Sequence, residues 1–85
     1  MNKGLKLQQL RYILAVLDEG GFKPAAKRLH RTQPALSLGI RELEESLGAA
    51  LLEKQGAGRL TPFGEVCVPR FRELLGVHDR VVKDL

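Results

Sequence analysis

Apolar residues recur every three or four positions along most of this chain, and that spacing is the repeat of an amphipathic α-helix. The pattern predicts a first helix over residues 7–19, which Gly20 and Gly21 end, because glycine is common just past a helix terminus. A short second helix is expected from Pro24 to about His30, since proline suits a first helical turn. The chain is therefore expected to be mostly α-helical.

Two threonines mark the starts of two longer helices. Thr32 is the expected N-cap of a third helix over residues 33–47. Thr61, followed directly by proline, opens a fourth helix that runs to the C-terminus. A local kink or a broken hydrogen bond is expected at Pro69, about two turns into this helix. The second and third helices, joined by only two residues, make a candidate helix-turn-helix.

The segment between the third and fourth helices has a different character. Gly56-Ala57-Gly58 is a turn signal between two short segments, at roughly 51–54 and 59–61. This arrangement predicts a two-stranded hairpin.

Size and composition exclude several classes of protein. A chain of 85 residues fits one small domain. Its longest apolar stretches are only a few residues, far below the roughly 20 of a membrane-spanning helix, and its N-terminus has no apolar signal core, so a cytoplasmic location is expected. The single Cys67 excludes an internal disulfide and, with two distant histidines, argues against a zinc site. No catalytic motif is present, so we expect neither an enzyme nor a cofactor.

Positive charge is concentrated in the first half of the chain. Residues 1–41 carry a net charge of +6 and residues 42–85 a net charge of −2. The stretch 23–41 has no acidic residue, and its basic residues are Lys23, Lys27, Arg28, Arg31 and Arg41. Such a block is typical of a polyanion-binding surface, although a solvated helix face explains it equally well.

The third helix separates into an apolar and a polar face when it is projected at about 100° per residue. Leu36, Ile40, Leu43 and Leu47 form the apolar stripe. On the opposite side lie Pro34, Leu38, Arg41 and Glu45, with Ser37 at the flank and Gln33 in the first turn. A helix in the major groove presents its N-terminal residues to base edges, where a Gln amide can pair with adenine and an Arg with guanine. Leu38 could touch a thymine methyl or be a singly exposed leucine.

The remaining polar residues have simpler interpretations. The acidic residues Glu42, Glu44 and Glu45 are expected to be solvated. Thr32 is expected to act mainly as a helix cap, and its hydroxyl could also serve a phosphate. Cys67 is expected to be a small packed side chain.

The last helix carries an apolar row with an average spacing near 3.5, which is typical of a coiled-coil seam. Its members are Val68, Phe71, Leu75, His78, Val82 and Leu85, and His78 is the one polar residue among them. This row predicts a homodimer that pairs through the C-terminal helix.

Six segments carry a specific pattern: LxxLRY at 7–12, AV at 15–16, GGF at 20–22, AAKRLHRTQPALS at 25–37, IRELEESLG at 40–48 and LTPFG at 60–64. Together they closely resemble the DNA-binding domain of LysR-type transcriptional regulators, from about residue 7 to 85. The resemblance implies a winged helix-turn-helix over residues 1–61, with three helices and a two-stranded wing, followed by a linker and dimerisation helix over 62–85. It also implies an effector-binding domain outside this chain, through which alone a small-molecule effector would act.

The resemblance assigns roles to residues by position. It places Thr32, Gln33, Pro34 and Ser37 against the major groove and nearby phosphates, Leu38 at a variable base-reading position, and Arg59 in the wing. With the charge pattern, it predicts base contacts from Gln33, Pro34, Ser37, Leu38 and Arg41, and phosphate or wing contacts from Lys23, Lys27, Arg31, Thr32, Lys54 and Arg59.

This sequence departs from the family pattern at several positions. Lys23 replaces a usual hydroxyl residue, and Leu52 and Lys54 replace a usual Phe and Arg.

The expected partner is double-stranded DNA bound by a cytoplasmic bacterial regulator. The alternative is a winged-helix module used only for protein–protein contacts.

Overall fold

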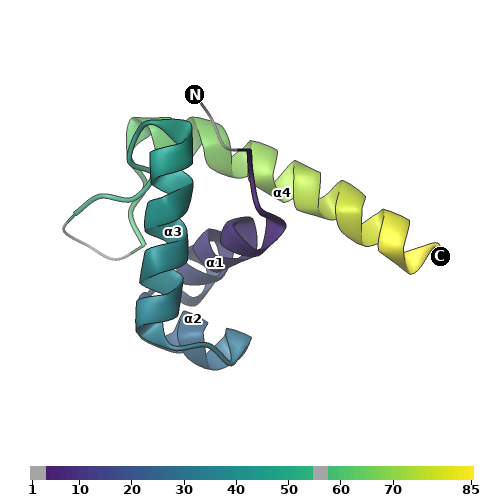
Figure 1. Cartoon of the computed structure of the whole chain (residues 1–85), viewed down its shortest axis with the longest axis horizontal. Helices are drawn as coiled ribbons and strands as arrows, with labels where there is room; N and C mark the ends of the chain where they lie inside the picture. Colours follow the sequence, from purple (N-terminus) through teal and green to yellow (C-terminus); the bar gives the residue numbers. More distant parts are fainter. Residues whose placement is uncertain (1–3, 55–57) are drawn as a thin grey trace.

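The computed structural model describes residues 4–54 and 58–85. Within them lie four helices: α1 (Leu7–Glu19), α2 (Phe22–Leu29), α3 (Gln33–Leu47) and α4 (Pro62–Lys83). Helices α1, α2 and α3 pack against one another, and the C-terminal part of α4 extends away from them (Figure 1). The prediction of a mostly helical fold is confirmed.

Local capping rules explain where the longer helices begin and end. The Oγ1 of Thr32 accepts a hydrogen bond from the Ala35 N–H at 3.1 Å, and the Oγ1 of Thr61 accepts one from the Gly64 N–H at 2.9 Å. Both threonines are therefore the N-caps that the sequence predicts. Gly48 ends α3 with a φ of 84°, a left-handed conformation that favours glycine.

Helix α2 starts earlier than predicted and ends where the sequence predicts, near His30. It begins at Phe22, two residues before Pro24, and no side chain caps it. It ends at Leu29, and His30 then takes a left-handed conformation with a φ of 54°. Only Arg31 and Thr32 separate this residue from α3, so the helix-turn-helix arrangement is present.

A single core joins all four helices. Leu10, Ile13, Val16, Leu36, Leu43 and Leu51 are its largest fully buried side chains. The Tyr12 ring of α1 packs directly against Gly39 of α3, where an added Cβ would lie 2.6 Å from Cδ2 of the ring. A glycine is needed at this crossing because any larger side chain would overlap the Tyr12 ring.

The predicted two-stranded hairpin is not formed as such. Among the described residues, pairing between the two segments is a single antiparallel bridge between Leu52 and Leu60, with no named strand. It is flanked by backbone hydrogen bonds of 2.9 Å from Glu53 N to Arg59 O and from Thr61 N to Leu51 O. The predicted turn at Gly56 and Ala57 lies outside the described residues. Two segments this short can hold one bridge, but a stable ladder needs more pairs.

The prediction that the whole apolar row of α4 forms a coiled-coil seam is wrong. Val68, Phe71 and Leu75 are buried in this chain's own core, at 6%, 4% and 6% exposure. They therefore cannot form an exposed seam. Only Val82 and Leu85, at the far end of the row, are exposed apolar residues.

The exposed apolar residues of the middle of α4 lie in a different register. Leu74, Val77 and Val81 are 42%, 45% and 56% exposed. Their spacing of three and four places them on one side of the helix. We refer to these three residues as the α4 stripe.

Candidate nucleic-acid interface

Helix α3 turns its polar face outward, as the projection predicts. Its underside is buried, with Leu36, Ile40 and Leu43 at 0%, 3% and 0% exposure. The five residues predicted to read bases are all exposed: Gln33, Pro34, Ser37, Leu38 and Arg41. The packing of α3 against α1 thus leaves its N-terminal half free to meet a ligand.

Shallow hollows connect this face to α2 and to the segment after α3. The first is lined by Phe22, Gln33, Pro34 and Ser37. A second continues past Ser37 and Arg41 to Lys54. A third contains Lys54 and Arg59. The structure therefore places four of the five predicted base readers and the two predicted wing cations, Lys54 and Arg59, along one continuous surface.

The cations of α2 and the turn are also accessible. Lys23, Lys27 and Arg31 are exposed, and none of them forms an ion pair within the part of the chain that the structure describes. Arg28 differs, because its Nη1 lies 3.0 Å from Oε2 of Glu19. The uncompensated charge of the basic block is thus carried by the lysines and by Arg31, as well as by Arg41.

Glu44 is not the solvated residue that the sequence predicts. It is half-buried, and its Oε2 accepts hydrogen bonds from the backbone N–H groups of Leu51, at 2.6 Å, and Leu52, at 3.2 Å. The carboxylate of α3 therefore holds the start of the segment that carries Lys54. The two donors follow Glu44 by seven and eight residues in the sequence, so no helical spacing rule could reveal the contact.

Two ion pairs join α1 to α4 on the other side of the molecule. Arg11 Nη2 lies 2.7 Å from Oδ1 of Asp79, and Arg72 Nη2 lies 2.7 Å from Oδ1 of Asp18. Hydrogen bonding to Arg72 lowers the pKa of Asp18, and hydrogen bonding to Arg11, then to His78, lowers the pKa of Asp79 to about 2. These pairs fix how α4 leaves the helical body.

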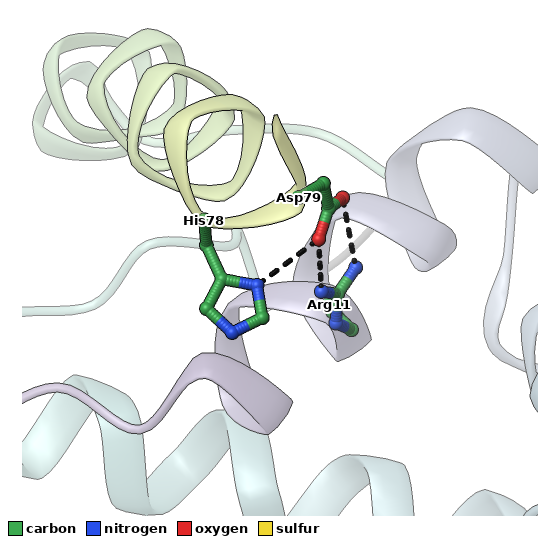
Figure 2. A network of polar contacts seen from close by, with 3 residues as sticks. All are labelled: Arg11, His78 and Asp79. Atoms are coloured by element: carbon green, nitrogen blue, oxygen red, sulfur yellow. Dashed lines mark hydrogen bonds and ion pairs between the residues drawn. The ribbon is translucent and has the colours of Figure 1, made fainter. Parts of the chain in front are cut away.

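His78 takes part in this network rather than in a buried seam. Its Nδ1 lies 3.1 Å from the same Oδ1 of Asp79 that Arg11 contacts (Figure 2). The imidazole is half-exposed. His78 therefore belongs to a surface cluster with Arg11 and Asp79.

Three other candidate features of the described residues are a metal site, a membrane-spanning helix and the thiol of Cys67. No three His, Cys, Asp or Glu side chains within 4–54 and 58–85 gather closely enough to hold a metal ion. Over the same residues, no helix has both the length and the apolar character needed to cross a bilayer. Cys67 is half-buried against the core, and this burial raises the pKa of its thiol, which agrees with a packing role.

Comparison with known proteins identifies a single family. Residues 7–65 match the family described as "Bacterial regulatory helix-turn-helix protein, lysR family". The chain is 40% identical over 77 residues to the HTH-type transcriptional regulator TfdT of Cupriavidus pinatubonensis, a match covering 89% of this chain and 34% of that protein. It is also 40% identical over 74 residues to the regulator ClcR of Pseudomonas putida, covering 86% of this chain and 25% of ClcR. The chain thus spans about a third or less of these relatives.

Solved structures show the same similarity. The CbnR_DBD–DNA complex superposes with a TM-score of 0.85 at 34% identity, covering 94% of this chain and 93% of that one. The BenM_DBD/catB site 1 DNA complex gives a TM-score of 0.86 at 39% identity, covering 93% and 86%. Because the family match spans well over half of its residues, this chain belongs to the lysR family of bacterial regulatory helix-turn-helix proteins.

Proposed function

We propose that this chain is the DNA-binding part of a bacterial transcriptional regulator that acts on double-stranded DNA in the cytoplasm. The observation that carries the proposal is the exposed N-terminal half of α3, where Gln33, Ser37 and Arg41 lie above a buried apolar underside. Relatives of this chain are named as transcriptional regulators, and two similar domains were solved on DNA.

In this proposal α3 enters the major groove. Gln33 and Ser37 line the same hollow, so their amide and hydroxyl groups can meet adjacent base edges. Arg41, two turns after Pro34, reaches a guanine or a phosphate. Pro34 supplies the apolar contact beside Gln33.

The surrounding cations hold the duplex by its backbone. Lys23, Lys27 and Arg31 are exposed and unpaired within the described residues, and Thr32 keeps its hydroxyl hydrogen available for a phosphate while its oxygen caps α3. Lys54 and Arg59 extend the same attraction along the segment after α3. Such contacts are independent of sequence and weaken with salt.

The chain is further proposed to act as a homodimer through the exposed part of α4. The α4 stripe, with Val82 and Leu85 beyond it, replaces the row that the sequence predicted. A two-fold pair favours an approximately palindromic site, with half-sites a whole number of helical turns apart. An effector would act through a domain outside this chain.

The test is base readout by Gln33. Gln33→Ala should weaken binding to a selected duplex by about 1–3 kcal/mol while leaving binding to random duplex unchanged. Gln8→Ala, an exposed glutamine on α1, is the matched control and should bind both duplexes like the wild type. Equal losses on both duplexes would remove Gln33 from base readout. No binding of any duplex at moderate salt would instead favour a protein–protein module.

A further inference from the structure

Leu38 is the one large exposed apolar side chain on the candidate DNA-binding face. Among the described residues, the other large apolar side chains with comparable exposure lie before α1, along α4 or just after it. Leu38 is 51% exposed in the N-terminal half of α3 and is absent from the residues that pack against the core.

The surroundings of Leu38 make a small apolar strip within a polar face. Pro34 lies one turn before it on the same side of α3 and is also exposed. Gln33, Ser37 and Arg41 border this strip with hydrogen-bonding groups. A duplex that meets these polar groups therefore also covers the Leu38 side chain.

The chemistry of the major groove limits what Leu38 can touch there favourably. Base edges in this groove present amino, carbonyl and ring-nitrogen groups, and their one apolar group is the C5-methyl of a pyrimidine. Leucine placed against the polar groups would remove them from water without replacing their hydrogen bonds. Against a C5-methyl, the same leucine buries two apolar surfaces.

We propose that Leu38 is a specificity-determining residue that recognises the C5-methyl group of a pyrimidine in the bound duplex. The inference rests on the proposed function, because it requires α3 in the major groove. Thymine carries this methyl in ordinary DNA, and 5-methylcytosine carries it in modified DNA. Removing one buried methyl group should weaken binding about fourfold.

The experiment uses duplexes that the wild-type chain selects from a random pool. Each thymine is replaced in turn by deoxyuridine, which deletes only the methyl, and each cytosine by 5-methylcytosine, which adds only the methyl. At one position per half-site, the wild type should lose about fourfold with deoxyuridine, or gain about fourfold with 5-methylcytosine. The first result assigns thymine as the source of the methyl, and the second assigns 5-methylcytosine.

Leu38→Ala must abolish that methyl effect while it still prefers the selected duplex. Leu5→Ala, an exposed leucine before α1, is the matched control and should keep the full effect. The inference is overturned if no replacement changes wild-type affinity, or if Leu38→Ala retains the same response at every position. If the wild type enriches no sequence at all, the proposed function fails, and the inference fails with it.

Discussion

Arg11 on α1 donates to both carboxylate oxygens of Asp79 on α4, with its shorter contact at 2.7 Å. The second ion pair reverses this arrangement, because Asp18 on α1 accepts from Arg72 on α4. On each helix the arginine precedes the aspartate by seven residues, which places both groups on one face. The two helices thus run antiparallel with reciprocal charges.

The Asp79 carboxyl group should make stability depend on acid pH. Its pKa is lowered from 3.8 to about 2 in the folded chain, so it stabilises the fold above pH 3.8 and loses that effect as the pH falls through 2. The difference in unfolding free energy between wild type and Asp79→Asn, measured by urea denaturation, should therefore shrink across this range. In an Arg11→Ala background the shrinkage should be smaller, and a difference unaffected by pH would contradict the assignment.

Glu44 should stabilise the segment after α3. Glu44→Ala leaves the backbone N–H groups of Leu51 and Leu52 without their acceptor, which should lower the free energy of unfolding by about 1–3 kcal/mol. Hydrogen exchange should show faster exchange at those two amides in particular. Glu42→Ala, an exposed neighbour on α3, is the control and should stay within about 0.5 kcal/mol of the wild type. Equal effects of both substitutions would argue against a stabilising role for the hydrogen bonds that Glu44 accepts.

Gly39 should tolerate no side chain. Gly39→Ala forces a Cβ to within 2.6 Å of the Tyr12 ring, and overpacking of this kind costs about 1–3 kcal/mol. Gly76→Ala is the matched helical control, because the nearest atom to its added Cβ is 3.8 Å away. It should stabilise α4 by about 0.5–1 kcal/mol through helix propensity. Thermal unfolding of the two variants should therefore shift in opposite directions.

Lys23 should contribute to phosphate binding. Lys23→Ala should reduce affinity for all duplexes and flatten the dependence of log affinity on log salt by about one unit. Lys83→Ala, at the far end of α4, is the control and should keep the wild-type slope. An unchanged slope in the Lys23 variant would exclude this residue from the phosphate contacts.

Association through α4 should depend on the exposed α4 stripe and not on Val68, Phe71 and Leu75, which are buried in the core. Val77→Asp with Val81→Asp should give a monomer by sedimentation that unfolds close to the wild-type temperature, because both side chains are exposed. Phe71→Ala should instead destabilise the fold by about 3–5 kcal/mol, since the ring is buried in the core. A dimer that survives the double substitution would reject the stripe as the contact.

Local signals in the sequence predicted most of the helices. Thr32 and Thr61 carry their own capping oxygens, and Gly20 and Gly48 supply left-handed termini, so these boundaries depend on neighbouring residues only. The predicted start of α2 is two residues too late, because Gly21 precedes the helix without a capping side chain. A weak local signal therefore gave the weakest boundary.

Local sequence signals do not reveal contacts between residues that are far apart in the sequence. The spacing of Val68, Phe71 and Leu75 shows that they share a face, but the same spacing serves a core and a dimer seam equally well. Glu44 finds its donors across the turn after α3, and Arg11 finds Asp79 at the opposite end of the chain. The exposure of Gln33, Ser37 and Arg41 was predictable because Leu36, Ile40 and Leu43 define the opposite face.

The two reciprocal ion pairs between α1 and α4 also affect how far apart the α3 helices of two paired chains would lie. Because both ends of a seven-residue span are anchored, α4 cannot swivel about Leu75 without breaking one arginine–aspartate contact. In two chains joined along α4, the distance between their α3 helices would then be set inside each chain. Exchanging Arg11 and Asp18 would alter which spacing of half-sites fits best, without touching a single group that faces DNA.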